Sequence, residues 1–446
     1  MVTTMANNTP DFKRPELLSP AGTLRNQRYA LAYGADAVYA GQPRYSLRTR
    51  ENDFDLTNLE TGIKEAHDLG KRFYVASNVL PHNAKVKSYM EDMAPVIALG
   101  PDALIMADPG LIMMVRERWP EVPIHLSVQA NTLNYATVNF WQAQGIERII
   151  LSRELSLDEI EEIRQQCPDM EMEVFVHGAL CIAYSGRCLL SGYMNHRDPN
   201  QGTCTNACRW DYDVKPAEID ATGDIKLASC GDQARHPGAD QPVLIEEGGR
   251  PGELMVMEED EHGTYIMNSK DLRAIEHVNR LTKMGIDCLK IEGRTKSHYY
   301  AARTAQVYRQ AIDDAVAGKD FDVSQLSILE GLANRGYTDG FLQRHHTHDY
   351  QNYMDGHSKS NEQLFVGEIT RVDTEKHLAE VVVKNKFAVG DKLELILPSG
   401  NKDIVLSDME NLKGDPMDVA PGGGHTVMIP WNEQAGELGL VARYIN

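Results

Sequence analysis

The stretch GADAVYAG, residues 34–41, contains the pattern that decides the fold. In it a glycine is followed two positions later by an acidic residue and then by a short apolar run. The same arrangement recurs at Gly100, Gly145 and Gly285. A glycine in this position is typical of a helix that ends in the left-handed conformation, and an uninterrupted apolar run is typical of a parallel strand buried on both faces.

More strand-like runs lie between these four, and amphipathic segments with helical periodicity separate them. The additional strand-like runs are Glu16–Ser19, Arg72–Ser77, Ile124–Val128 and Glu173–His177. Clear examples of the helical segments are Asn58–Leu69, Leu157–Gln166 and Asp271–Met284. Alternation of this kind predicts an α/β fold, a TIM-like (β/α)8 barrel, and a doubly wound open sheet is the alternative. No G-x-G-x-x-G follows the first run, which disfavours a dinucleotide-binding sheet.

The sequence divides into three regions. Residues 1–330 are expected to form the barrel, with a cysteine-rich insertion after its seventh strand, and residues 331–363 a connecting segment. The histidines of that segment are irregularly spaced among polar residues, so we expect a solvated linker rather than a metal site. From residue 364 to 446 short alternating runs predict a small all-β barrel, which could bind nucleic acid, dock a partner or cap the fold.

Composition limits the possible partners and compartment. The formal net charge is −20, so any nucleic acid would need a local basic patch. No apolar run approaches the roughly 20 residues that span a bilayer. The N-terminal residues lack the apolar region of a secretory signal. We therefore expect a cytoplasmic protein without membrane contact, in which cysteines remain reduced.

Four of the seven cysteines lie in one polar, glycine-containing stretch, residues 176–210. Cys181, Cys188, Cys204 and Cys208 have the spacing C-x6-C-x15-C-x3-C. On spacing alone a zinc site and a 4Fe-4S cluster are both open, with a disulfide as a lesser alternative. A hydrolase that uses His177 and Cys181 is less favoured, because no third group orients the pair. Cys167, Cys230 and Cys288 are expected to be structural thiols.

Several motifs resemble those of the collagenase-like peptidase family, in particular its bacterial tRNA hydroxylation branch, along essentially the whole chain. They are PELLSPAGT, GADAVYAG, HLSVQAN, ILSRELS, VFVHGALCIAYSGRCLLSGY, GTCTNACRW, RPGE, NSKDL and IEGRTKS. The resemblance implies an oxygen-independent hydroxylase that forms 5-hydroxyuridine at the wobble position of tRNA. It also implies prephenate as cosubstrate, the iron–sulfur assembly machinery as partner, and the four cysteines as ligands of a 4Fe-4S cluster. Some relatives carry a cysteine where this chain has Arg273, so Cys208 is the least secure ligand.

Two sets of residues follow from this resemblance and from the barrel, whose active sites form at the C-terminal ends of strands. Arginines there suit the two carboxylates of prephenate, although each could instead face solvent. Candidate substrate-binding residues are Tyr39, His125, Gln129, Arg153, His177, Lys270, Glu292 and Arg294. Candidate residues for the tRNA anticodon loop are Arg44, Arg48, Arg50, Arg187, Arg197 and Arg209, together with lysines of the terminal domain.

The motifs assign no catalytic residue. The competing hypotheses are a peptidase, a hydroxylation factor for another substrate such as rRNA, and a non-catalytic scaffold with structural zinc.

Overall fold

The structure, a computed structural model, describes most of the chain. The described residues are 12–42, 44–47, 52–181, 183–189, 200, 270–334, 336–343, 363–432 and 436–445, with the backbone of short strands between 217 and 265. Within this part of the chain no helix is long and apolar enough to cross a membrane.

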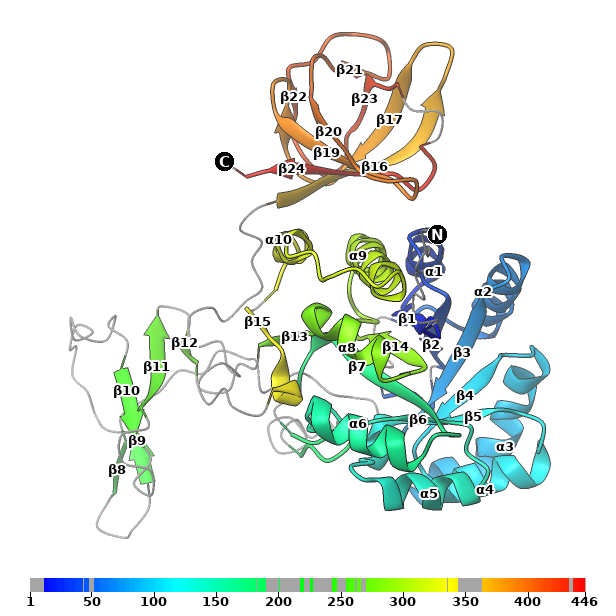
Figure 1. Ribbon diagram of the computed structural model, residues 1–446. Helices are drawn as coiled ribbons and strands as arrows, with labels where there is room; N and C mark the ends of the chain where they lie inside the picture. The colour runs from blue at the N-terminus through cyan, green and yellow to red at the C-terminus, as the bar shows by residue number, and fades with distance from the viewer. Residues whose placement is uncertain are drawn as a thin grey trace, which may run out of the picture.

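A closed barrel of parallel strands forms the larger domain (Figure 1). Its strands are β1 (Glu16–Pro20), β2 (Ala37–Gly41), β3 (Arg72–Ser77), β4 (Ala103–Met106), β5 (Ile124–Leu126), β6 (Arg148–Ile150), β7 (Glu171–Ala179) and β14 (Cys288–Ile291). Each strand pairs with the next, and β14 pairs in parallel with both β7 and β1. This closure confirms the TIM-like prediction, and the doubly wound alternative is wrong.

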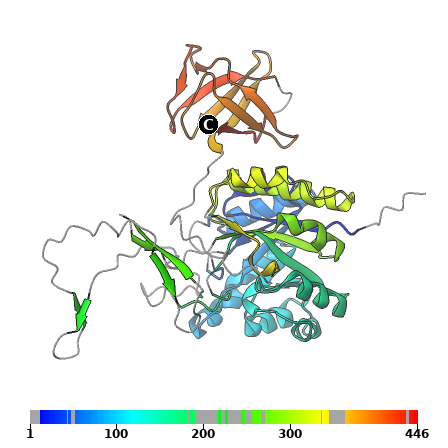
Figure 2. The same ribbon diagram turned by 60° about the vertical axis from the view of Figure 1, so that its left-hand side comes forward.

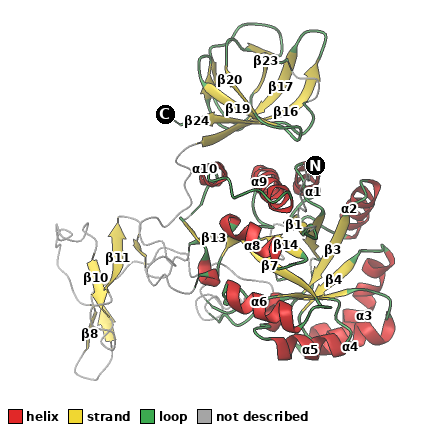
Figure 3. Cartoon of the chain, in the orientation of Figure 1, coloured by secondary structure: helices red, strands yellow, loops and turns green. Residues whose placement is uncertain are grey.

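Helices cover the outside of the barrel (Figure 3). They are α1 (Leu24–Ala32), α2 (Leu56–Asp68), α3 (Asn83–Ala98), α4 (Pro109–Arg118), α5 (Tyr135–Ala143), α6 (Leu157–Gln166), α8 (Val278–Lys283) and α9 (His298–Val316). Capping side chains explain several helix starts: Thr23, Asp55 and Ser156 each accept a hydrogen bond from a backbone N–H of the first turn. Four glycines before strands, Gly34, Gly100, Gly145 and Gly285, have φ between +72° and +109°. The left-handed helix ends expected from the sequence are thus confirmed.

The chain between β7 and β14 contains strands that lie outside the closed ring (Figures 1 and 2). They are β8 (Ala217–Ile219), β9 (Ile225–Leu227), β10 (Val243–Glu246), β11 (Leu254–Asp260), β12 (Gly263–Tyr265) and β13 (Asp271–Arg273). The expected helix over 271–284 is wrong in its first half. Strand β13 pairs antiparallel with the end of β7, a 3-10 turn follows at Ile275–His277, and only α8 is helical.

The C-terminal domain is an antiparallel all-β half-barrel with its own apolar core. It follows α10 (Ser324–Glu330), β15 (Tyr337–Thr338) and a 3-10 turn at Gly340–Leu342. Its strands are β16 (Gln363–Asp373), β17 (Leu378–Val383), β18 (Phe387–Ala388), β19 (Lys392–Ile396), β20 (Lys402–Val405), β21 (Glu410–Asn411), β22 (Val419–Ala420), β23 (Thr426–Pro430) and β24 (Leu440–Tyr444). The predicted β domain is confirmed. The histidine-rich stretch before it lies outside the described residues.

Helices α1 and α9 of the barrel face this domain (Figure 1). Buried polar contacts join them to it. Tyr29 donates to a Glu368 carboxylate oxygen at 2.7 Å, and Tyr33 donates to the Ile396 carbonyl at 2.7 Å. Arg303 on α9 forms an ion pair with Glu394 on β19, and both side chains are less than one-tenth exposed. Because these groups are removed from water and paired with each other, the two domains are fixed in one relative position.

Replacement of Arg303 by Met is expected to lower the free energy of unfolding by about 3–5 kcal/mol, because it leaves the buried Glu394 carboxylate without its cation. Urea unfolding followed by tryptophan fluorescence measures this change. Arg28→Met is the matched control, because Arg28 also pairs with a glutamate, Glu65, but is 50% exposed. That change should cost no more than about 1 kcal/mol. Equal losses in the two variants would contradict a special role for the buried pair.

Candidate functional site

Charged side chains converge at the mouth, which we define as the C-terminal ends of the barrel strands. Arg153 follows β6, and Glu292 and Arg294 follow β14. An Arg153 guanidinium nitrogen lies 3.7 Å from a Glu292 carboxylate oxygen. The Tyr39 hydroxyl of β2 lies 3.3 Å from the same carboxylate, and the Arg294 guanidinium carbon lies 5.7 Å from the Tyr39 ring centroid. The structure therefore brings together four of the residues predicted to bind substrate.

Both arginines are held in place by neighbours other than Glu292. Arg153 donates to the Ala179 carbonyl at 3.0 Å, and its guanidinium carbon lies 3.9 Å from the centroid of the Phe175 ring. Arg294 donates to the Ser46 hydroxyl at 2.6 Å. Two guanidinium groups held in this way at one end of the barrel suit a small anion that carries carboxylates.

Tyr39 is a neutral hydrogen-bond donor at this site. Burial, and then the nearby Glu292 carboxylate, raise the pKa of Tyr39 well above its ordinary value. Its hydroxyl donates to the Ile291 carbonyl at 3.1 Å.

Directly beneath Tyr39 lies a buried ion pair that the sequence analysis missed. The Lys290 ammonium lies 2.7 Å from a Glu173 carboxylate oxygen and 4.3 Å from the Tyr39 ring centroid. Both residues are at most 3% exposed. The sequence could have indicated this pair, because Lys290 and Glu173 are charged residues inside otherwise apolar strand-like runs.

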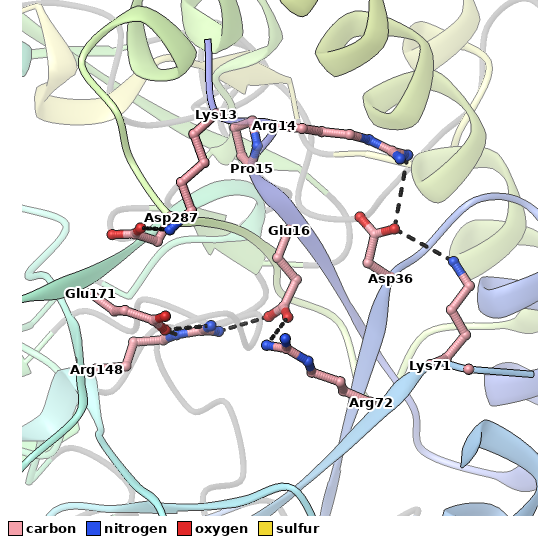
Figure 4. A pocket seen from close by; sticks show the side chains of 11 residues that line it. Lys13, Arg14, Pro15, Glu16, Asp36, Lys71, Arg72, Arg148, Glu171 and Asp287 are labelled. Atoms are coloured by element: carbon pink, nitrogen blue, oxygen red, sulfur yellow. Dashed lines mark hydrogen bonds and ion pairs between the residues drawn. The ribbon is translucent and has the colours of Figure 1, made fainter. Parts of the chain in front are cut away.

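The opposite, N-terminal end of the barrel contains a cavity of about 330 Å³ lined by ion pairs (Figure 4). Glu16 accepts from Arg72 at 3.1 Å and from Arg148 at 2.7 Å, and Arg148 also binds Glu171 at 2.8 Å. In TIM-like barrels this end serves stability rather than chemistry. We therefore interpret the network as the closure of the barrel floor.

His125 lies at this floor and not at the mouth, where the sequence analysis had placed it. Strand β5 is only three residues long, and His125 pairs in register with Arg148 at the start of β6. Its ring packs against Tyr74 with centroids 4.7 Å apart. Burial, and then the positive charges of Arg148 and Lys290, hold the pKa of His125 well below its ordinary value.

His177 also lies away from the mouth, because β7 has an irregularity at its end. Phe175 and His177 pair with consecutive residues of β14, so Val176 is the extra residue of a bulge. The bulge turns the His177 ring outward. The ring centroid lies between 5.4 and 5.8 Å from the centroids of three tyrosine rings, Tyr300, Tyr308 and Tyr337. Its Nδ1 lies 3.2 Å from the Tyr308 hydroxyl.

Gln129 lies at the mouth and supports the cysteine segment. Its side-chain oxygen accepts from Asn78 at 3.2 Å and from the Ser127 hydroxyl. Gly186, between the first two cysteines, packs directly on it: a Cβ at Gly186 would lie 2.9 Å from the Gln129 Cβ. The segment that follows β7 therefore folds back over the end of β5.

Two of the four predicted metal ligands lie within the described residues. Cys181 is exposed, Cys188 is partly buried, and both are free thiols. Cys204 and Cys208 lie outside the described residues. Within the described ranges no three potential metal ligands come together. A four-thiolate site would need these two thiols together with the two that lie outside the described residues.

The remaining predicted residues are scattered. Lys270 precedes β13, and its side chain lies near Gly336, at the outer edge of the sheet. Arg44 is half-exposed and pairs with Asp92 at 2.5 Å, whereas Arg187 is exposed on the cysteine segment. Arg48, Arg50, Arg197 and Arg209 lie outside the described residues. In the terminal domain Lys384 and Lys386 are exposed, and Lys392 pairs with Asp403 at 2.8 Å.

These features define a TIM-barrel protein with an arginine-lined mouth, a cysteine segment over it and a docked β domain. The chain belongs to Peptidase family U32: the family pattern matches residues 22–352, and that of the family's C-terminal domain matches residues 361–443.

Three relatives illustrate the similarity. The chain is 66% identical to tRNA hydroxylation protein P of Escherichia coli, over 94% of each chain. It is 58% identical to tRNA hydroxylation protein P of Haemophilus influenzae, again over 94% of each. It is 29% identical to a 23S rRNA 5-hydroxycytidine synthase of Escherichia coli, over 87% of this chain and 53% of that protein.

Acidification is expected to destabilise the protein through its buried histidines. Burial lowers the pKa of His177 to about 3 and that of His298 to about 4, whereas an unfolded histidine has a pKa near 6.5. The neutral rings contribute fully to the free energy of unfolding above pH 6.5, and this contribution is lost as the pH falls toward the pKa of the folded state. Between pH 6 and pH 5 each such histidine should cost about 1 kcal/mol.

His177→Phe should lower the number of protons taken up on unfolding by about one, and so make the unfolding free energy depend less steeply on pH. The aromatic volume is retained, and Tyr308 keeps its hydrogen bond to the Val176 carbonyl. Urea unfolding at several pH values between 5 and 7 measures the slope. A variant with the wild-type slope would show that His177 is not buried as a neutral ring.

Proposed function

We propose that the protein hydroxylates tRNA. The observation that carries this proposal is the identity of 66% with tRNA hydroxylation protein P of Escherichia coli, which extends over both domains. An alignment of this length includes the mouth residues, the cysteine segment and the terminal domain together. It therefore concerns the whole arrangement and not the barrel alone.

In its finer form, the proposal is that the product is 5-hydroxyuridine at the wobble position and that prephenate is the cosubstrate. Prephenate carries two carboxylates, and the mouth holds two guanidinium groups, of Arg153 and Arg294, whose positions are fixed by other contacts. Each could bind a carboxylate through two parallel hydrogen bonds. The Tyr39 hydroxyl lies beside them, 3.3 Å from the Glu292 carboxylate. Glu292 would repel a misplaced carboxylate and so favour one orientation of the ligand.

Cys181, Cys188, Cys204 and Cys208 are proposed to hold a 4Fe-4S cluster, delivered by the iron–sulfur assembly machinery. Support comes from the two described thiols, which are free and lie on a segment anchored over the mouth. A bound cluster would supply one-electron chemistry or a binding position for an anionic group. The chain itself binds the anion through its arginines and excludes water through the packed segment above them.

The target base must leave the anticodon stack to reach the mouth. In enzymes that modify a nucleobase, contacts to the extruded base and its phosphates offset the free-energy cost of unstacking. An unpaired loop requires less energy to open than a duplex, so an anticodon loop suits a site at the end of a barrel.

A second candidate is hydroxylation of rRNA, favoured by the similarity to the 23S rRNA 5-hydroxycytidine synthase, half of whose length the match covers. The peptidase hypothesis rests on the names of the family and of relatives, among them an uncharacterized protease that is 33% identical to this chain. The separate hypothesis of a hydrolase that uses His177 and Cys181 is disfavoured, because three tyrosine rings surround His177 and among the described residues no contact joins it to Cys181.

Expression of the protein in a bacterial strain that lacks tRNA hydroxylation should restore 5-hydroxyuridine derivatives, measured by mass spectrometry of tRNA nucleosides. Arg153→Lys should raise the Kd for prephenate, measured by calorimetry, about 10- to 100-fold, because the bidentate contact is lost. Arg118→Lys, an exposed arginine on α4, is the control and should bind prephenate normally.

Three results would count against parts of the proposal. Unchanged tRNA nucleosides would refute the tRNA activity. If 5-hydroxycytidine then appeared in the rRNA of a second strain that lacks it, the second candidate would take its place. Wild-type protein that does not bind prephenate would refute the cosubstrate alone.

Protein purified without oxygen should contain four iron and four sulfide per chain, and Cys181→Ser should lose most of both, because a thiolate ligand is removed. Elemental analysis and the visible absorption spectrum provide the measurements. Cys167→Ser is the control, because Cys167 is buried beside Asn139 at the end of α6. One zinc per chain without iron would support a structural metal site instead.

A further inference from the structure

The segment that carries Cys181 and Cys188 contains a tight turn that is closely fitted to the barrel. The Arg187 N–H donates to the Tyr184 carbonyl at 3.1 Å, which closes the turn. Gly186 has φ of +72°, a conformation that favours glycine, and it packs on Gln129 with no room for a side chain. The turn is therefore specified both by its backbone and by its contact with the mouth.

One side chain, that of Asn131, clamps this turn to the end of β5. Its amide nitrogen donates to the Ser185 carbonyl at 2.9 Å, and its oxygen accepts from Arg187 Nε at 3.1 Å. The same amide nitrogen donates to the Val128 carbonyl at 2.9 Å. Asn131 has φ of +52°, so the clamp itself lies in a sparsely populated backbone conformation. Two of these three hydrogen bonds hold the turn, and the third anchors the Asn131 side chain to the backbone just after β5.

The clamped turn displays an aromatic ring and a guanidinium group to solvent. Tyr184 is 46% exposed, and Arg187, three residues later, is also exposed. The Asn131 contact is made by Nε of the guanidinium group and not by its terminal nitrogens. Proteins bind unpaired RNA with exposed aromatic rings and nearby guanidinium groups: the ring stacks on a base, and the cation contacts a phosphate. This turn presents one of each, three residues apart.

We propose that Tyr184 and Arg187 form a stacking platform for an unpaired base of the tRNA anticodon loop. Tyr184 stacks on a base, and Arg187 contacts the adjoining phosphate. The turn that carries both residues packs on Gln129 at the mouth through Gly186, so a base held there lies at the same end of the barrel as Arg153 and Arg294. This inference rests on the proposed function, to which it adds the residues that receive the RNA.

A synthetic anticodon stem-loop RNA, labelled with a fluorophore, tests the platform by fluorescence anisotropy. Tyr184→Ala should raise the Kd about 5- to 150-fold, which corresponds to the roughly 1–3 kcal/mol of base–aromatic stacking. Its salt dependence should remain that of wild type. Arg187→Ala should instead reduce the slope of log K against log salt by about one phosphate contact. Tyr184→Phe retains the ring and should recover most of the affinity.

Tyr135→Ala is the matched control. Tyr135 is 43% exposed, nearly the same as Tyr184, but lies at the start of α5 in the outer helical layer. Its loss should leave RNA affinity unchanged. Thermal melting of each variant shows whether the fold is retained, and tRNA nucleosides from cells that express each variant give a second readout.

The outcomes separate the platform from the function. If wild type binds the stem-loop and forms 5-hydroxyuridine, and Tyr184→Ala does both equally well, the platform is refuted while the function stands. If wild type neither binds the RNA nor restores 5-hydroxyuridine, both are refuted. Normal RNA binding by Tyr184→Ala with reduced iron content would refute the platform and show that the ring supports the proposed cluster site, since Tyr184 lies between Cys181 and Cys188.

Discussion

The pairing of β14 with both β7 and β1 is the constraint on which the rest of the structure depends. It closes the ring across a long interruption, since the chain leaves the barrel after β7 and returns only at Cys288. The closure fixes the ends of β6, β7 and β14 side by side, and these ends carry Arg153, the cysteine segment and Arg294. Without it, the mouth would be an open edge, and its charged groups would not face one another.

The closed ring has an unusual interior. TIM-like barrels fill it mainly with branched apolar side chains, but here Glu173 and Lys290 form an ion pair that water does not reach. Transfer of two charges from water into a protein is costly, and a buried pair of this kind adds little net stability. The position of the pair gives another reason for its presence. The Lys290 ammonium lies under the ring of Tyr39, so it fixes the electrostatic potential just below the arginines of the mouth.

Much of this arrangement can be predicted from the sequence, because glycines at helix ends and apolar runs are local signals. Gly34 and Gly100 mark the strands that follow them for this reason. The failures come from non-local effects. The bulge at Val176 reverses the direction of His177, and no alternation pattern reveals one extra residue in a strand. Asp271–Arg273 became a strand because it pairs with β7, a partner almost a hundred residues away in sequence. His125 was misplaced because strand length, and not strand order, sets the level of a side chain in a barrel.

The docking of the β domain on α1 and α9 has a consequence for recognition. Because Arg303, Tyr29 and Tyr33 fix the two domains through buried contacts, the separation between the mouth and the outer surface of the β domain is constant. A rigid molecule that touches both surfaces must match that separation. Ligands would then be selected by size as well as by chemistry, because a molecule too short to reach the β domain would make only the contacts at the mouth.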